Sequence, residues 1–295
     1  ELREAGVDAP LLAWLHAPDE DFRTATDADV AIGASTLSHL DALAQCDNPP
    51  VHLKIDTGLG RNGAGRDDIE PLIARAAELH HAGRIRVEGL MSHCSGTSRE
   101  ADLSQAEEFE IALAGLRAHG VDPEFRHLAA SAAAIDHPSL RHSMVRFGIA
   151  AYGLAPADHL RFIGVRPAMR VESNVILTKG LRPGDGVSYN HLWRATEHTT
   201  VALVPLGYAD GIPRAATGSA SVAINGQRFP VVGRIAMDQM VVNVGDAQVS
   251  EGDVVSVWGD SIDGTPHPDE WADWAGTIGY EIVTRLGRRV VRVTA

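Results

Sequence analysis

The sequence has few cysteines, few aromatic residues and no long apolar run. Two of its 295 residues are cysteines, and only 5% are aromatic. Two cysteines cannot build a disulfide framework or a zinc cage, which excludes disulfide-rich scaffolds and zinc domains. No apolar run approaches the roughly 18–20 residues that cross a bilayer, and the charged first residues lack the apolar core of a secretory signal. The sequence therefore predicts a cytoplasmic protein with no membrane segment and no metal site.

Positive charge is also scarce. The chain has 26 Lys and Arg against 39 Asp and Glu, a formal charge of -13, and its only lysines are Lys54 and Lys179. A field of that sign repels phosphate backbones, so nucleic-acid binding is not expected. The fractions of hydrophobic and charged residues, 44% and 22%, are those of a globular protein. The length fits one large domain or two ordinary ones.

The first half alternates β-rich runs with helical patterns. Helical periodicity spans residues 67–81 and 99–119, and a glycine follows each pattern as a stop signal. Such alternation is typical of a parallel α/β sheet. We expect either an open six-stranded sheet or a (β/α)8-type barrel that is incomplete at its N-terminus. The six expected strands are Leu11–His16, Asp29–Ala34, Val51–Asp56, Val87–Ser92, Phe125–Ala129 and Met144–Ala150.

The second half has a different pattern. From about residue 165, β-branched runs are separated by turn dipeptides, and Asn225-Gly226 lies between two apolar runs as in a β-hairpin. One helix is expected over residues 268–276. These features predict a mostly antiparallel β domain. We expect two domains, residues 1–165 and 166–295.

Polar residues follow the expected parallel strands, where ligands bind in such sheets. The loop from Gly58 to Gly63 matches a dinucleotide fingerprint, but the next helix starts only near Asp67 and Arg61 stands inside the loop. One reading is a guanidinium fork for a small carboxylate. The other is a surface arginine paired with Asp67 or Asp68.

Three further residues near strand ends have two readings each. His93 is compatible with a role in acid–base catalysis or in stacking on a ring, and also with a hydrogen-bonded histidine of the core. Ser131, before an alanine-rich stretch, fits a helix N-cap and also an anion site. Arg146 lies inside the apolar run MVRFGIA, and a buried arginine is costly unless it is paired, which favours a functional role.

Taken together, the motifs resemble alanine racemase, a bacterial fold-type III family that depends on pyridoxal 5'-phosphate. The matching segments occur in the family's order and cover the chain from the third barrel strand onward. They are KIDTGLGRNG at 54–63, EGLMSH at 88–93, MVRFGIAAYGLAP at 144–156, VSYN at 187–190, PLGYADG at 205–211 and VGRIAMDQ at 232–239.

The resemblance implies an eight-stranded barrel that binds the cofactor, followed by a β domain that completes the active site of a partner subunit in a homodimer. It implies that D-alanine is made for peptidoglycan by a two-base mechanism. Implied cofactor-binding residues are His93, Ser131, Arg146, Gly148 and Ile149. Tyr189 is the implied catalytic base; Arg61, Tyr208, Met237 and Asp238 contact substrate, and Lys54 and His127 support the site.

Three departures from the family stand out. In the family, the lysine that forms the Schiff base ends the first barrel strand, and neither Lys54 nor Lys179 has a matching motif. Lys54 instead resembles a family lysine that is often carbamylated. An unmodified Lys54 would be a partner for Asp56. Ala130 replaces an asparagine, and residues 284–287 lack a tyrosine. We therefore expect that two βα units are missing and that the chain as given does not racemise alanine.

Other functions are compatible with parts of the pattern. A broader-specificity racemase or a non-catalytic fragment remains an alternative. A decarboxylase of similar plan needs a cysteine in the β domain, whereas Cys46 and Cys94 lie in the first half. A non-catalytic carrier of the cofactor would lack the β domain.

Overall fold

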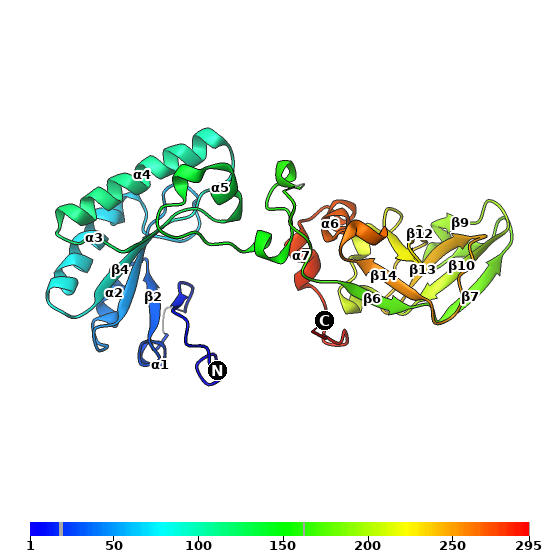
Figure 1. The fold of residues 1–295 in the computed structure, drawn as a ribbon, viewed down its shortest axis with the longest axis horizontal. Coiled ribbons are helices and arrows are strands. Elements are labelled where there is room, and N and C mark those ends of the chain that lie inside the picture. Colours follow the sequence, from blue (N-terminus) through cyan, green and yellow to red (C-terminus); the bar gives the residue numbers. More distant parts are fainter. Residues whose placement is uncertain (18–19, 162, 295) are drawn as a thin grey trace. The chain divides into compact units, whose positions relative to one another are not determined.

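A computed structural model describes residues 1–17, 20–161 and 163–294. The chain folds as two compact units, Glu1–Gly148 and Ile149–Ala295 (Figure 1). The boundary inferred from composition, at residue 165, stays a prediction for the functional domains. Along the chain, the boundary between the two compact units falls between Gly148 and Ile149.

Unit 1 contains a parallel sheet covered by helices. Its five strands follow chain order, β1-β2-β3-β4-β5, and every neighbouring pair is parallel (Figure 1). The elements are β1 Leu11–Ala13, α1 Arg23–Thr26, β2 Val30–Ala34, α2 Leu37–Leu43, β3 Pro50–Lys54, α3 Arg66–His81, β4 Arg86–Met91, α4 Arg99–Ala118, β5 Phe125–His127, α5 Ser131–Asp136 and the 3-10 turn Pro138–Leu140.

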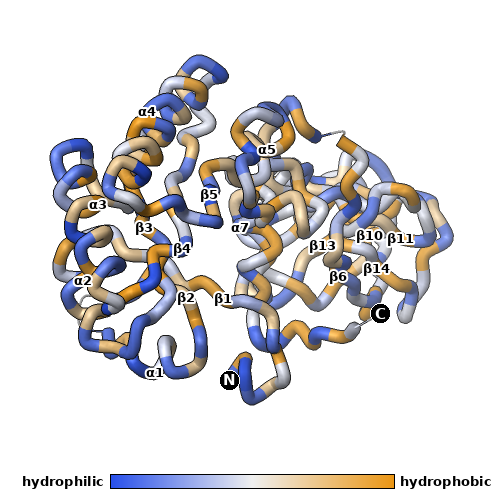
Figure 2. The backbone as a smooth tube through the Cα atoms, turned by 60° about the vertical axis from the view of Figure 1, so that its left-hand side comes forward, coloured by the Kyte–Doolittle hydropathy of each residue, from blue (hydrophilic) through white to orange (hydrophobic). Residues whose placement is uncertain are grey.

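The apolar pattern of these elements explains their packing. All five residues of β3 are buried, as in a strand covered on both faces. Helix α3 buries one face at the expected spacing, with Leu72, Ile73, Ala76 and Leu79 toward the core. Figure 2 shows α2, α3 and α4 beside these strands, with apolar and polar residues mixed along each element. The expected parallel α/β architecture of the first half is therefore confirmed, as a half-barrel sheet of five strands.

The sixth expected strand, Met144–Ala150, does not form within the described residues. This segment makes one isolated parallel bridge, between Ala130 and Arg146, and enters a 3-10 turn at Ile149–Tyr152. The side chain of Arg146 binds the carbonyl oxygens of His127 and Leu128. Those oxygens could otherwise accept bonds from a neighbouring strand, so a guanidinium takes the place of a backbone ladder.

Unit 2 is mostly antiparallel, as the sequence predicts. One sheet has the order β6-β14-β11-β12-β13-β10-β7, and β8 pairs with β9. The strands are β6 Val171–Asn174, β7 Leu177–Leu181, β8 Gly186–Val187, β9 Trp193–Arg194, β10 Thr199–Val204, β11 Ser221–Ile224, β12 Gln227–Val232, β13 Met240–Gly245 and β14 Val254–Trp258. The helices are α6 Pro268–Ala275 and α7 Gly279–Thr284, with 3-10 turns at Asp158–Leu160, Tyr189–His191, Tyr208–Asp210, Arg214–Ala216 and Ser261–Asp263.

Local sequence signals explain two features of unit 2. Asn225 and Gly226 both adopt positive φ, 52° and 77°, and join β11 to β12 in the expected hairpin. Helix α6 begins after His267, whose ring accepts from the N–H of Asp269, and Gly276 ends it in the left-handed region.

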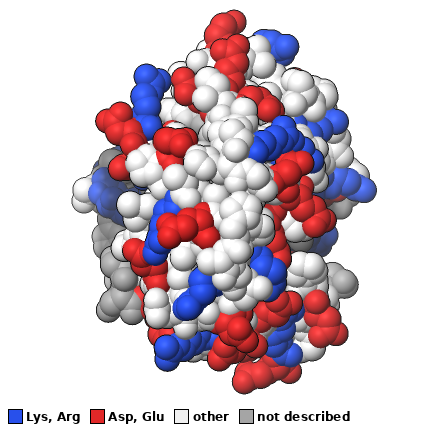
Figure 3. Space-filling model, turned by 90° about the vertical axis from the view of Figure 1, so that its left-hand side faces the viewer, with Lys and Arg blue, Asp and Glu red and all other residues white. Residues whose placement is uncertain are grey.

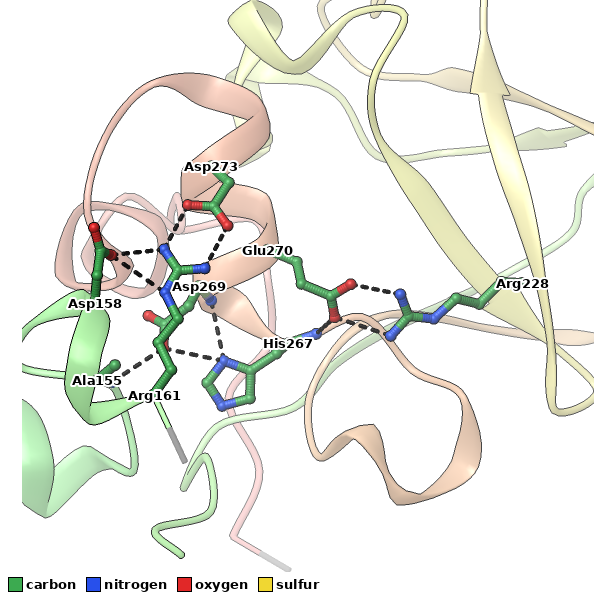
Figure 4. A network of polar contacts seen from close by, with 8 residues as sticks. All are labelled: Ala155, Asp158, Arg161, Arg228, His267, Asp269, Glu270 and Asp273. Atoms are coloured by element: carbon green, nitrogen blue, oxygen red, sulfur yellow. Dashed lines mark hydrogen bonds and ion pairs between the residues drawn. The ribbon is translucent and has the colours of Figure 1, made fainter. Parts of the chain in front are cut away.

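An ion-pair cluster attaches residues 155–161 to α6 (Figure 4). The guanidinium of Arg161 holds Asp273 through two bonds of 2.5 and 2.6 Å and also binds Asp158. Asp269 accepts from the N–H of Ala155 at 3.0 Å. These contacts explain why the segment after Ile149 packs as part of unit 2.

The surface carries charges of both signs. On the face in Figure 3, acidic and basic side chains are interspersed. Exposed pairs on the helices of unit 1 include Arg75 with Asp41 and Arg66 with Glu108. Within the described ranges, no helix has the length and apolar character that a membrane span requires.

Candidate active site

The carboxyl ends of β3, β4 and β5 lie level with one another. Lys54, the last residue of β3, is in register with Met91, the last of β4, and Met91 is in register with His127, the last of β5. Residues that follow these strands therefore emerge at one rim, where ligands bind in parallel α/β sheets. Arg61, His93 and Ser131 come from these segments, and Arg146 lies beside the end of β5 through its bridge to Ala130.

Arg146 is at the centre of this rim. Its Nη1 donates to the oxygen of His127 at 2.7 Å and to the His127 ring at 3.0 Å. Its Nη2 donates to the oxygens of Ser92 and Leu128, at 2.6 and 3.1 Å, and to Nδ1 of His93 at 3.1 Å. Every one of these acceptors is neutral, and no described carboxylate forms an ion pair with the guanidinium. The Nε–H has no partner among the described residues, so it remains available as a donor.

The rim collects positive charge although the whole chain is acidic. Lys54 is 6% exposed, and its ammonium has no hydrogen bond to any described residue. Burial lowers the pKa of Lys54, the charges of Arg61 and Arg146 lower it further, and Asp56 opposes them. Burial followed by the charges of Arg146, Arg61 and Lys54 lowers the pKa of His93 to about 4. Three cations with one nearby carboxylate suit an anionic ligand.

The glycine loop after β3 is organised by Asp56. Its carboxylate accepts from the N–H groups of Gly58, Gly60 and Arg61 at 2.9–3.1 Å. Burial raises the pKa of Asp56, but these backbone donors outweigh burial and hold it below its ordinary value. Asp56 therefore shapes the loop and forms no ion pair with Lys54.

The structure also tests two other interpretations of this loop, a dinucleotide-binding site and a surface ion pair of Arg61. Helix α3 starts at Arg66 after the cap residue Gly65, so the glycines of the loop do not open the helix as in a dinucleotide site. Arg61 is exposed and forms no ion pair with Asp67, Asp68 or any other described residue. Its guanidinium can therefore bind a ligand without breaking an existing pair.

Gly63 and Gly60 provide a test of the loop's geometry. A Cβ on Gly63, at φ +139°, would lie 2.4 Å from the carbonyl carbon of Ile55, whereas a Cβ on Gly60, at φ +70°, meets open space. We expect Gly63→Ala to lower the free energy of unfolding by about 3 kcal/mol and Gly60→Ala by about 1 kcal/mol. Urea denaturation of both variants measures the difference. Equal losses would contradict the close contact at Gly63.

Ser131 and Gly148 meet beside Arg146. Ser131 is the first residue of α5, and its Oγ accepts from the N–H of Gly148 at 3.1 Å. The N-cap position is held by Ala130, which makes no side-chain cap, so the expectation that Ser131 caps the helix is wrong. The N–H of Arg146 donates to Ala129, which fixes the segment next to Ser131. Ile149 directly follows Gly148 and begins unit 2.

The expected residues of unit 2 form a second group. The N–H groups of Tyr208 and Ala209 donate to the oxygens of Ala236 and Met237, at 3.0 and 2.7 Å. A Cβ on Gly207 would lie 2.4–2.5 Å from this backbone, so only glycine permits the contact. Tyr208, Met237 and Asp238 therefore share one exposed edge.

Tyr189 projects from a constrained turn near the same edge. Ser188 and Asn190, on either side, have φ of +58° and +63°, and the hydroxyl of Ser188 donates to the oxygen of Arg234 at 2.7 Å. Tyr189 is 69% exposed. A hollow of about 410 Å³ adjoins it. Its lining residues are Ser188, Tyr189, Asn190, His191, Leu203, Arg234, Ala236, Gln239 and Val241.

Sequence reasoning missed His52. It lies on β3 two residues before Lys54, so strand alternation places both on one face of the sheet. His52 is 4% exposed, and its Nδ1 lies 2.8 Å from Nε2 of His127. The spacing His-x-Lys within an otherwise apolar strand is the signal that could have revealed it.

The two buried histidines predict a loss of stability in mild acid. Burial lowers the pKa of His52 to about 4. Burial, followed by the charges of Arg146 and His52, lowers the pKa of His127 to about 2. Below pH 6.5 the histidines bind protons in the unfolded chain but not in the folded chain. The free energy of unfolding therefore decreases as the pH decreases. Each histidine should contribute a loss of about 1.2 kcal/mol between pH 6 and pH 5.

The pH slope is measured by urea denaturation of the wild type and of His52→Asn. The substitution should remove one histidine's share of the slope. An unchanged slope would show that His52 takes up its proton equally in the folded and unfolded chains.

His80 and His81, the last two residues of α3, both have hydrogen-bond partners. His80 accepts from the N–H of Val87 at 3.2 Å, and the His81 ring lies 2.9 Å from the oxygen of His119. In the part of the chain that the structure describes, no group of His, Cys, Asp or Glu is arranged to hold a metal ion.

Comparison with known proteins gives two family matches. The family described as "Alanine racemase, N-terminal domain" matches residues 1–156, and "Alanine racemase, C-terminal domain" matches residues 168–294. The chain is 42% identical to an alanine racemase of Thermobifida fusca, over 99% of this chain and 80% of that protein. It is also 42% identical to one of Mycobacterium tuberculosis, over 99% and 78%.

Solved structures agree with this result. The alanine racemase of Streptomyces lavendulae superposes with a TM-score of 0.95 at 39% identity, covering 99% of this chain and 79% of that one. The enzyme of Bacillus anthracis, solved with bound L-Ala-P, gives a TM-score of 0.86 at 32% identity, covering 99% and 78%.

Proposed function

Because the chain belongs to the alanine racemase family, whose members are isomerases, we propose that its site serves the interconversion of L-alanine and D-alanine with pyridoxal 5'-phosphate as cofactor, a reaction that also needs a second, lysine base. The observation that carries the proposal is the guanidinium of Arg146. It is held at the rim by neutral acceptors only, and its Nε–H has no described partner.

The rim residues fit this cofactor. Ser131 and the backbone N–H groups of Gly148 and Ile149 would hold the phosphate; Ser131 Oγ and the Gly148 nitrogen are already 3.1 Å apart. His93 would lie by the pyridine ring. When bound, the cofactor delocalises the electron pair that proton removal leaves on Cα.

Arg146 would donate its Nε–H to the pyridine nitrogen. Burial lowers the pKa of Arg146 to about 10, so the guanidinium remains protonated at neutral pH and cannot release a proton to the ring. A pyridine nitrogen kept unprotonated is a weaker electron sink, which restricts side reactions. His127 supports this guanidinium through its ring and its carbonyl oxygen.

Arg61 would bind the substrate carboxylate, steadied by Lys54. The alanine racemase of Bacillus anthracis was solved with bound L-Ala-P. In a homodimer, Tyr208, Met237 and Asp238 of one subunit would close the pocket of the other. Tyr189 would exchange a proton with one face of Cα, as one of two bases.

The second base of the family is a lysine, and only Lys54 and Lys179 are available here. Lys179 pairs with Val201 within the antiparallel sheet, and Lys54 is buried beside two arginines. We therefore expect residues 1–295 to bind the cofactor without racemising alanine. With the lysine present, the product D-alanine would serve peptidoglycan synthesis in the cytoplasm.

The test uses residues 1–295 and a version extended by a first barrel strand that ends in lysine. Pyridoxal 5'-phosphate is titrated into each, followed by absorbance, and D-alanine formation from L-alanine is measured. We expect both to bind the cofactor and only the extended version to racemise. Racemisation by residues 1–295 alone would refute the need for that lysine, and no binding by either would refute the proposed function.

A further inference from the structure

Three side chains form a continuous hydrogen-bonded chain that ends at the rim. Nδ1 of His52 lies 2.8 Å from Nε2 of His127, and Nδ1 of His127 lies 3.0 Å from Nη1 of Arg146. We propose that His52 is a positioning residue that acts through His127 to fix the orientation of Arg146. No motif in the sequence pointed to His52.

The direction of each bond follows from the arginine. A guanidinium has only donors, so Nδ1 of His127 must accept. His127 is buried and neutral, because burial and Arg146 lower its pKa to about 2, so its single proton lies on Nε2. That proton points at Nδ1 of His52, which must therefore accept. His52, also neutral, carries its own proton on Nε2.

The alternative tautomer of His127 is disfavoured at its Arg146 end, because a proton on Nδ1 would make two donors face each other there. Arg146 therefore sets the tautomer, with the proton of His127 on Nε2. His52 supplies the acceptor for that buried N–H. A buried donor without an acceptor is costly, so loss of the His52 acceptor would release His127 from this arrangement.

The sheet holds His52 in place. His52, Gly89 and Phe125 lie in one row across β3, β4 and β5, in a register that shifts just before His52. A Cβ on Gly89 would lie 2.3 Å from Nδ1 of His52, so the ring occupies the space above this glycine. The ring stacks on that of Phe125 at 5.5 Å and 15°.

The flanking strands of this row are about 10 Å apart, so the two rings can meet only across a residue without a side chain. His127 follows Phe125 by two residues and faces the same side. The row of three residues therefore presents His52 to His127 at a fixed place.

The catalytic consequence rests on the proposed function, because the Nε–H of Arg146 reaches the cofactor only if the rim binds it. The tautomer chain itself does not depend on any ligand. The two parts therefore need separate measurements on the same variants.

The variants are His52→Asn and His52→Leu, two side chains of nearly equal shape. Asparagine can place an acceptor oxygen near the position of Nδ1, whereas leucine has none. His119→Leu is the control, since His119 is an exposed partner of Glu70 in the same unit. None of these positions contacts the proposed substrate.

The first measurement is long-range proton–nitrogen NMR of the full chain with nitrogen-15 histidine, without cofactor. We expect His52, His93 and His127 as neutral tautomers protonated on Nε2. His52→Asn and His119→Leu should keep the His127 signals, and His52→Leu should shift or broaden them. A His127 protonated on Nδ1 in the wild type, or His127 signals unchanged in His52→Leu, would overturn the proposal.

The second measurement is the Kd of pyridoxal 5'-phosphate by absorbance titration. His52→Leu should raise the Kd about 10-fold, the effect of one hydrogen bond, and His52→Asn less than about 2-fold. Equal Kd values in both variants would overturn the positioning role. If the wild type binds no cofactor, the proposed function fails, and the NMR result still decides the tautomer chain. If His52→Leu does not fold, the wild-type and His52→Asn spectra decide it.

Discussion

Replacing Tyr189 with phenylalanine is expected to slow alanine racemisation about 10³-fold, the contribution of a positioned general base. The lysine-extended protein is used, so that both proposed bases are present. Stability should change by less than about 0.5 kcal/mol, because Tyr189 is 69% exposed and its hydroxyl has no described hydrogen-bond partner. The loss is therefore chemical and not structural.

Deuterium exchange separates the two bases. If each base serves one face of Cα, Tyr189→Phe should still exchange the α-proton of one alanine enantiomer with solvent while racemisation is lost. Tyr152→Phe is the matched control, because Tyr152 is also exposed and lies against the ring of Tyr280. Full racemisation by Tyr189→Phe, or equal loss in the control, would exclude Tyr189 as a base.

Replacing Arg146 with glutamine should weaken cofactor binding and lower racemisation at least about 10²-fold, as for loss of an electrostatic donor at a reacting group. It should also lower the free energy of unfolding by about 3 kcal/mol, since acceptors that the guanidinium satisfies lose their donor. These include the carbonyl oxygens of Ser92, His127 and Leu128.

Two further variants separate the role of the Arg146 guanidinium from the general effect of losing an arginine. Arg146→Lys keeps the charge but not the planar fork, so it should restore little of the activity. Arg75→Gln removes an exposed arginine that binds Asp41 and Glu78, and it should leave the free energy of unfolding nearly unchanged, because exposed ion pairs contribute little. Cofactor Kd and urea denaturation measure both effects. An Arg146→Gln protein with wild-type Kd would remove Arg146 from the proposed site.

Several features of the fold could be predicted because their signals are local. The helix at Arg66–His81 follows from its apolar period and its glycine stop, and the Asn225-Gly226 turn follows from its preference for positive φ. The missing sixth strand could not be predicted. Residues 144–150 have strand-like composition, but the Arg146 side chain occupies carbonyl oxygens at the end of β5.

The sequence by itself determined the α/β and antiparallel parts of the chain, its family resemblance and the identity of Arg61, Arg146 and Tyr189 as candidates. These properties depend on residue types and on short spacings, which the chain order preserves. The family membership then rests on matches over nearly its whole length.

Only the tertiary structure decided which groups share an environment. His52 and His127 are 75 residues apart, and Arg146 reaches Ser92 across 54 residues. Their hydrogen bonds, lowered pKa values and tautomers arise because adjacent parallel strands end at one level and exclude water there. Burial and distance are properties of the folded chain, so no local pattern contains them.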